Sequence, residues 1–278
     1  MTPPPSPAQT LVARLMELFA TFPQVRAITL GGSQATGEVD SQSDIDLYVY
    51  YTAPLMSLSQ RQALVVQAGG ARQADLGLEF WGPGDEWFDT ATGIEVDVVY
   101  FEVAWFEEQM RRLWVDCEPG LGYTTCLWYT LASAQLLHDP RGWLSGLQSQ
   151  APRQYPERLR QAIVAKNRPV LRQVIPAYLH QVEKAVRRAD LVSVNHRLAA
   201  LLASYFDILF AANRLLHPGE KQLVRLAQER CSRLPRDFTA EIEAVLQAAG
   251  MPGPLLLESL NALLDHLDEL LREEGLIE

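Results

Sequence analysis

Strict alternation of apolar and polar side chains marks two segments in the first half of the chain, residues 44–51 and 94–101. The first segment places Ile45, Leu47, Val49 and Tyr51 on one face, and Asp44, Asp46, Tyr48 and Tyr50 on the other. Because successive side chains of a strand point to opposite faces, this period of two predicts two half-buried strands. Shorter apolar runs predict strands over residues 25–30 and 76–81, and Pro83-Gly84 predicts a turn.

Apolar positions at helical spacing predict helices over residues 9–22, 57–68, 103–115 and 124–134. Beyond Pro152 the pattern is almost entirely helical, and Pro169 and Pro176 are expected to break or kink the first of these helices. Residues 191–216 are apolar nearly all round, which is typical of a buried central helix. The leucine face of residues 254–272 docks either on the bundle or on a second subunit, so the pattern allows a homodimer.

The order of these elements predicts two domains, the number expected for 278 residues at roughly 100–200 residues per domain. Residues 1–152 are expected to form a small α/β (α+β) domain with a mixed β-sheet. Residues 153–278 are expected to form an all-α helical bundle. The composition is that of a globular protein, since 48% of the residues are hydrophobic and 21% are charged.

Charge is distributed unevenly along the chain. The net charge is −10 overall, with −11 on residues 1–152, +10 on residues 153–236 and −9 on residues 237–278. An acidic chain argues against a general nucleic-acid binder, which usually carries a basic surface. The basic segment is expected to line one wall of a cleft and to offset the charge of a bound triphosphate. Within it Lys221 is the first candidate for a phosphate contact, followed by Arg168 and Arg172.

The expected compartment is the cytoplasm. The three cysteines form no CxxC pair, the N-terminus shows no basic and apolar segments of a signal peptide, and the longest apolar stretch, residues 198–212, contains Asp207. A membrane-spanning helix needs about 20 apolar residues. We therefore expect no membrane association. The histidines lack paired zinc-ligand spacing, and Asp207 is expected to be buried and paired to a neighbour on its own helix.

The candidate chemistry lies on the two alternating strands. Asp44 and Asp46 stand at positions i and i+2 of one strand, so they project from the same face about 6.5–7 Å apart. Such a pair can hold two divalent cations about 3.5–4 Å apart, the arrangement of two-metal phosphoryl transfer. Asp97 on the other strand is the natural third ligand if the two strands pair, and Glu95 on the same face is the substitute.

A glycine turn precedes this pair of carboxylates. Gly31 and Gly32 follow the strand at 25–30, and without a Cβ their backbone can turn tightly and approach phosphate oxygens. Ser33 adds a hydroxyl donor. The turn is not a P-loop, because the chain contains no GxxxxGK[ST] sequence.

Gly32-Ser33, ten further residues, Asp44-Ile45-Asp46-Leu47 and the later Asp97 together resemble the DNA polymerase β-type nucleotidyltransferase superfamily. The two-domain plan resembles the bacterial antibiotic nucleotidyltransferases. The run from Tyr155 to Lys221 resembles a bacterial nucleotidyltransferase-like family of unknown function. These resemblances imply a nucleotidyltransferase domain over residues 1–152. Thr36 stands where minimal members often carry an arginine, so one phosphate contact is missing from the turn.

The resemblance implies that Asp44, Asp46 and Asp97 bind metal, that Asp97 also helps to deprotonate the attacking hydroxyl, and that the Gly-Ser turn holds the triphosphate. The expected function is Mg²⁺-dependent transfer of a nucleoside monophosphate, AMP from ATP or the equivalent from another nucleoside triphosphate, to a hydroxyl of a small molecule. Two Mg²⁺ ions are expected, and pyrophosphate is released. The alternatives are a non-catalytic, antitoxin-like partner protein with this fold and a transferase that acts on RNA or protein.

Overall fold

The computed structural model describes residues 5–32 and 44–278. Contacts divide the chain into two compact units, one of residues 1–111 with 130–151 and one of residues 112–129 with 152–278. We call them the N-terminal and the C-terminal unit. Segment 112–129 belongs to the C-terminal unit although N-terminal residues flank it on both sides. The boundary at residues 152 and 153 stays a prediction for independently folding domains.

The N-terminal unit is built on a mixed sheet, as the sequence predicts. In the part of the chain that the structure describes, the sheet has six strands in the order β3-β4-β5-β2-β1-β6. Strands β2 and β5 run parallel, and the other neighbouring pairs are antiparallel. The strands are β1 Val25–Leu30, β2 Ile45–Tyr51, β3 Ala71–Leu78, β4 Gly84–Asp89, β5 Glu95–Glu102 and β6 Gln135–His138.

The edge of the sheet differs from the prediction. Strand β3 begins five residues before the expected strand at 76–81 and ends before Trp81, which is 92% exposed. Strand β4 begins at Gly84, where a turn was expected. The reason is that β4 turns Asp85 and Asp89 toward the interior, so its buried face does not read as apolar. Strand β6 completes the opposite edge.

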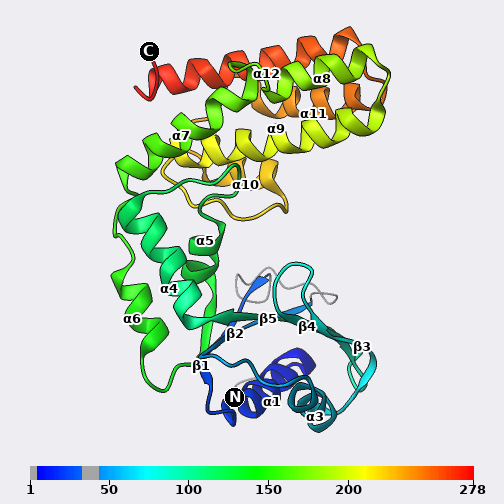
Figure 1. Ribbon diagram of the computed structural model, residues 1–278, viewed down its shortest axis with the longest axis vertical. Helices are drawn as coiled ribbons and strands as arrows, with labels where there is room; N and C mark the ends of the chain where they lie inside the picture. Colours follow the sequence, from blue (N-terminus) through cyan, green and yellow to red (C-terminus); the bar gives the residue numbers. More distant parts are fainter. Residues whose placement is uncertain (1–4, 33–43) are drawn as a thin grey trace. The chain divides into compact units, whose positions relative to one another are not determined.

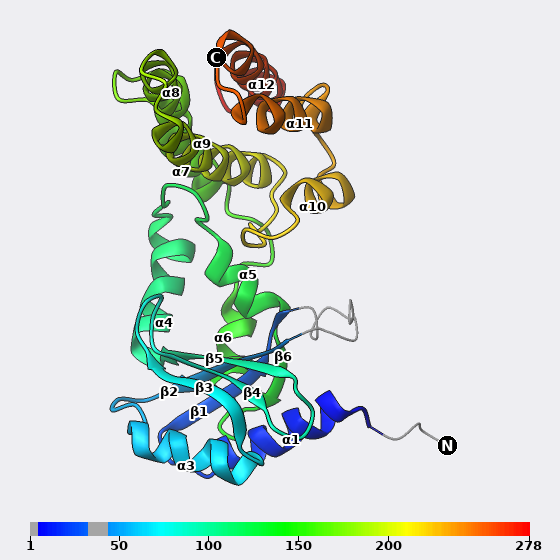
Figure 2. The same ribbon diagram turned by 90° about the vertical axis from the view of Figure 1, so that its right-hand side faces the viewer.

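Helices cover the two faces of this sheet (Figures 1 and 2). Helices α1 Pro7–Ala20 and α3 Leu58–Ala68 pack on the face that buries Ile45, Leu47 and Val49. Both begin at a serine capping box, which satisfies backbone N–H groups of their first turns. Helices α4 Val103–Arg111 and α6 Trp143–Gln150 lie on the other face, where Phe106 and Trp143 contact the ring of Tyr50.

The C-terminal unit is helical, as the sequence predicts. Its core lies between helices α7, α8, α9, α11 and α12. The C-terminal unit begins with a π-helical turn, Arg112–Asp116, which directly follows α4. The helix expected over 103–115 therefore changes from α to π type at residue 112. The helices are α7 Glu157–Arg172, α8 Tyr178–Arg187, α9 Leu191–Ala212, α10 Leu223–Arg230, α11 Phe238–Ala249 and α12 Pro254–Glu273, and α5 Cys126–Ser133 connects the units.

Pro169 does not break the helix, because α7 continues through this residue to Arg172. The last turn of the helix is held by tertiary contacts, since Leu171 is buried and Arg172 is ion-paired to Asp268 on α12. The break falls at Pro176, between α7 and α8. Within the described residues, no helix combines the length and the apolar character needed to cross a membrane.

Candidate active site

Four carboxylates form a row across four neighbouring strands. Asp46 on β2 is the direct register partner of Asp97 on β5, Asp97 is the partner of Glu86 on β4, and Glu86 is the partner of Asp75 on β3. Side chains of direct partners stand on the same face of a sheet, and neighbouring strands lie about 4.8 Å apart. The structure therefore brings Asp46 and Asp97 side by side, on the face opposite α1 and α3.

Two further carboxylates, Asp44 and Glu95, come two residues before Asp46 and Asp97 respectively. Asp44 directly precedes β2 and is exposed, and Glu95 is the first residue of β5. Burial first, and then the negative charge of Asp44, raises the pKa of Glu95. The expected set of Asp44, Asp46 and Asp97 with Glu95 as its neighbour is thus gathered in one region. Glu86 was missed, because residues 84–89 do not read as a strand in the sequence.

The surroundings of Asp97 raise its pKa to about 6. Burial is the largest cause, followed by the negative charges of Asp46 and Glu86. Like charges on directly opposed positions of a sheet destabilise the fold. A cation bound between them would relieve this repulsion. Destabilising clusters of like charge are typical of functional sites.

The donor set suits a divalent cation in its chemistry. No group of three or more carboxylate, thiol or imidazole side chains among residues 5–32 and 44–278 is arranged to hold a metal ion by itself. Mg²⁺ in proteins usually keeps several waters and binds through one or two carboxylates together with substrate phosphates. Asp46 and Asp97 offer two carboxylates, the number that a protein commonly contributes to such a site.

The glycine turn rests directly on Asp46. The Gly31 N–H donates to the backbone carbonyl of Asp46 at 2.8 Å, so this N–H is already hydrogen-bonded. Gly32 has a φ of 61°, and a Cβ at this position would lie 1.8 Å from Oδ2 of Asp46. A side chain at this position would be strained by the positive φ and would displace the Asp46 carboxylate, so glycine suits it best. Ser33 and Thr36 lie outside the described residues.

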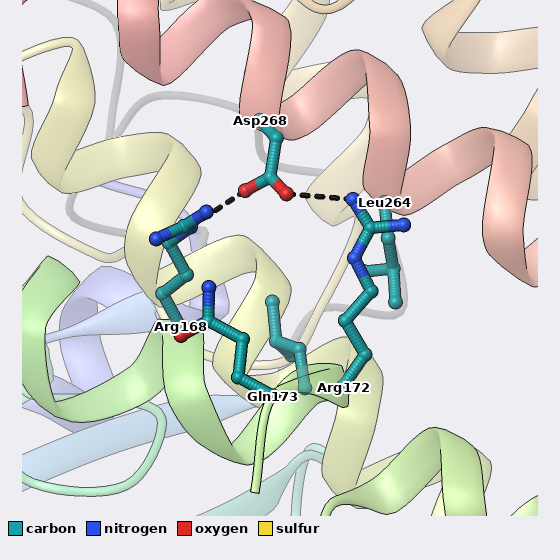
Figure 3. A pocket seen from close by; sticks show the side chains of 6 residues that line it. Arg168, Arg172, Gln173, Leu264 and Asp268 are labelled. Atoms are coloured by element: carbon teal, nitrogen blue, oxygen red, sulfur yellow. Dashed lines mark hydrogen bonds and ion pairs between the residues drawn. The ribbon is translucent and has the colours of Figure 1, made fainter. Parts of the chain in front are cut away.

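The basic candidates all lie in the C-terminal unit. Lys221 is exposed in the turn between α9 and α10. Arg168 and Arg172, the next two candidates, both point at one carboxylate of α12 (Figure 3). Arg168 Nε and Arg172 Nη2 each lie 2.6 Å from an oxygen of Asp268, and the two hydrogen bonds lower its pKa despite its partial burial. Arg168 and Arg172 thus join α7 to α12, whereas no ion pair is found for Lys221 in the described part of the chain.

A buried polar network centred on Asp207 anchors the loop before α5. From the sequence, Asp207 was expected to pair with a neighbour on its own helix. Asp207 is buried as expected, but its partners come from outside α9. Thr124 donates to it from the backbone N at 2.9 Å and from Oγ1 at 2.6 Å. Asn167 on α7 donates to it at 3.3 Å. The network stabilises the C-terminal unit and contains no exposed reactive group.

Comparisons with known proteins give two family matches. Residues 12–115 match the model described as "Nucleotidyltransferase domain", and residues 124–223 match the model described as "Domain of unknown function (DUF4037)". No curated protein matches the sequence.

Two solved structures are similar over 96% of this chain. A nucleotidyltransferase-like protein from Exiguobacterium sibiricum 255-15 shares 12% identity, is covered over 75% of its length and has a TM-score of 0.44. A STING-associated CdnE c-di-GMP synthase from Capnocytophaga granulosa shares 13% identity, is covered over 79% and has a TM-score of 0.27. By its family matches, the chain carries a nucleotidyltransferase domain of the polymerase β type over residues 12–115 and a domain of unknown function over residues 124–223, and residues 224–278 lie outside both matches.

Proposed function

We propose that the protein is an Mg²⁺-dependent nucleotidyltransferase that transfers AMP from ATP to a hydroxyl group of a small molecule. The observation that carries this proposal is the register pairing of Asp46 with Asp97 across β2 and β5, beside the turn at Gly32. A nucleotidyltransferase domain supports transfer of a nucleotidyl group in general. The choice of ATP follows the resemblance to the nucleotidyltransferases, and the metal and the acceptor are our inferences from the charges around this pair.

In the proposed reaction the acceptor hydroxyl attacks the α-phosphorus in line, the bond to the bridging oxygen breaks, and pyrophosphate leaves with the electron pair. Bound Mg²⁺ supplies Lewis-acid stabilisation of the charge on the phosphates. Asp44, Asp46 and Asp97 would hold it. Asp97 also accepts the proton of the attacking hydroxyl as a general base.

The turn and the basic segment serve the triphosphate in this proposal. Gly32 and Ser33 hold it through backbone N–H groups and a hydroxyl, while Gly31 supports the turn through its hydrogen bond to Asp46. Lys221 supplies a positive charge for the phosphates. It lies at an exposed turn, outside the ion pairs that engage Arg168 and Arg172.

The charge of the N-terminal half favours a neutral or cationic acceptor. Residues 1–152 carry a net charge of −11, and the acidic row continues beyond Asp97 to Glu86 and Asp75. Such a surface attracts a cation and repels a polyanion. We therefore favour a small hydroxyl-bearing molecule, such as an aminoglycoside-like or lincosamide-like compound, over RNA. Cytoplasmic location and a homodimer stay predictions.

The test is a pyrophosphate-release assay with ATP and Mg²⁺ on three acceptor pools: aminoglycosides and lincosamides, tRNA, and purified proteins. We expect release with the first pool. Asp46→Asn should lower the rate about a thousandfold, equivalent to about 4 kcal/mol of transition-state stabilisation. Glu17→Gln is the matched control, because it changes an exposed carboxylate on α1, which covers the opposite face of the sheet, and should retain the rate.

Each alternative has its own outcome. Activity confined to tRNA, with affinity that falls steeply as salt rises, would replace the small-molecule acceptor by RNA. Activity confined to the protein pool would replace it by a protein side chain. Nucleotide binding without turnover in any pool, together with a stable complex with another protein, would favour the non-catalytic partner. Full Mg²⁺-dependent release by Asp46→Asn would refute the assignment of the site.

A further inference from the structure

Tyr48 lies next to the candidate metal ligands, although no motif marks it. It follows Asp46 by two residues on β2, so both side chains stand on the same face. Its register partners are Thr29 on β1 and Val99 on β5. Burial, followed by the negative charges of Asp46 and Asp97, raises the pKa of Tyr48 to about 12.

The Tyr48 ring has an aromatic neighbour. The ring of Phe101 on β5 lies with its centroid 5.8 Å from that of Tyr48. Phe101 in turn stacks on Trp105 of α4 at 5.9 Å, with an interplanar angle of 7°. An aromatic chain from α4 to β2 thus restricts the rotamer of Tyr48.

The outer end of the same ring covers Gly31. A Cβ built on Gly31 would lie 2.4 Å from Cε2, 2.8 Å from Cζ and 2.9 Å from Oη of Tyr48. Gly31, unlike Gly32, does not have a positive φ, so its backbone would accept another residue. The Tyr48 ring is what requires glycine at position 31, just as Asp46 excludes a Cβ at position 32.

We propose that Tyr48 is a positioning residue that sets where the Gly31–Gly32 turn lies relative to Asp46 and Asp97. Two consecutive glycines rest on two successive side chains of the same face of β2, one of them a candidate metal ligand. The turn is therefore held against β2 at two points. This inference rests on the proposed function: if the turn binds the triphosphate, the Tyr48 ring determines where the α-phosphate lies relative to the metal ligands.

A double-mutant cycle between positions 31 and 48 tests the proposal, with KM for Mg²⁺-ATP, kcat and thermal unfolding measured for each variant. Gly31→Ala should raise KM about tenfold or more with a smaller change in kcat, because displacement of a positioning element by about 1 Å can cost up to about a hundredfold. Tyr48→Leu removes the ring atoms that cover Gly31 but keeps apolar bulk, and should also raise KM. The double variant should be no worse than Tyr48→Leu, since the new Cβ then has room.

Two controls separate the ring from its hydroxyl and from general glycine effects. Tyr48→Phe retains the ring and should keep KM within about twofold of the wild type, because a substitution that leaves the packing intact changes little. Gly146→Ala introduces the same methyl group in α6 at a position with no heavy atom within 4 Å, and should leave KM unchanged.

Several outcomes would overturn the positioning role. Additive effects of Gly31→Ala and Tyr48→Leu on KM would show that the two positions act independently. Coupling in the unfolding temperature without coupling in KM would make the contact merely structural. A KM for Tyr48→Phe as high as that of Tyr48→Leu would assign the role to the hydroxyl. Absence of ATP binding by the wild-type chain would refute the proposed function and this inference together, whereas turnover with additive variants would refute this inference alone.

Discussion

Arg61 Nη1 lies 2.6 Å from Oδ1 of Asp85, and both side chains are buried in the N-terminal unit. The carboxylate also accepts hydrogen bonds from Gly77 N at 2.7 Å and from Tyr100 Oη at 2.6 Å. Arg61 comes from α3, Gly77 from β3 and Tyr100 from β5, so one carboxylate joins three elements. Asp85 precedes Glu86 on β4, and its burial holds β4 in the register that brings Glu86 beside Asp97.

Breaking this buried pair should destabilise the N-terminal unit strongly. Arg61→Met leaves the Asp85 carboxylate buried without its cation, which costs about 3–5 kcal/mol. Chemical denaturation with two optical probes measures the free energy of unfolding. Arg72→Met is the matched control, because Arg72 is exposed and donates only to the carbonyl of Thr90 among the described residues. The double variant Arg61→Met/Asp85→Leu should recover part of the loss, and no recovery would contradict a charge-based explanation.

Ser33→Ala should weaken triphosphate binding by about 1–2 kcal/mol, which is typical for loss of a hydrogen bond to a charged group. The expectation rests on the position of Ser33 directly after the turn at Gly31 and Gly32. Isothermal titration with Mg²⁺-ATP measures the change. An unchanged affinity would mean that the turn is only a structural bend.

The basic residues of the C-terminal unit should separate into two classes. Lys221→Ala is expected to lower triphosphate affinity at low salt, where exposed charge contacts are strongest, and to leave stability unchanged. Arg172→Ala should lower the free energy of unfolding by about 1–2 kcal/mol, because it removes charged hydrogen bonds to Asp268 and Asp265. Triphosphate affinity should not change in Arg172→Ala. The opposite assignment of the two effects would show that Arg172, not Lys221, contacts phosphate.

Two buried groups of the C-terminal unit should give stability slopes of opposite sign in acid. Burial lowers the pKa of His217 to about 4 and raises that of Asp207 to about 6. Between about pH 4 and 6.5 the unfolded chain binds the His217 proton and the folded chain does not, so this group destabilises the fold as pH falls. Between about pH 3.8 and 6 the folded chain alone retains the Asp207 proton, so this group stabilises the fold as pH falls.

Single substitutions should therefore change the pH dependence of the free energy of unfolding in opposite directions. Relative to the wild type, His217→Gln should lose less stability on acidification from pH 6.5 to 4, and Asp207→Asn should lose more. Urea denaturation at half-unit pH steps measures both differences, and the titration of all other groups cancels in the comparison. Parallel curves for the two variants would show that neither group is perturbed by burial.

The sequence by itself determined the strands that carry Asp46 and Asp97. Each alternates apolar and polar residues, and a period of two places these carboxylates opposite the side chains that fill the core. The helical character beyond Pro152 could be predicted equally well, because a long helical period of apolar residues indicates a helix whatever that helix packs against. That β5 pairs with β2 was conditional at the sequence level, since periodicity assigns a face to a residue but no neighbour to a strand.

Only the tertiary structure decided the roles of residues whose partners are distant in the chain. Strand β4 was hidden because Asp85 is buried by an arginine 24 positions earlier, and Glu86 was hidden with it. Arg168 and Arg172 read as free cations, yet α12 supplies Asp268 about a hundred residues later. Gly31 was predicted to contact phosphate, whereas the Tyr48 ring covers it and its N–H donates to the backbone carbonyl of Asp46. The physical reason is that local pattern reports the preference of a residue for water or core, while burial of a charge or close approach to a glycine depends on a partner that arrives only on folding.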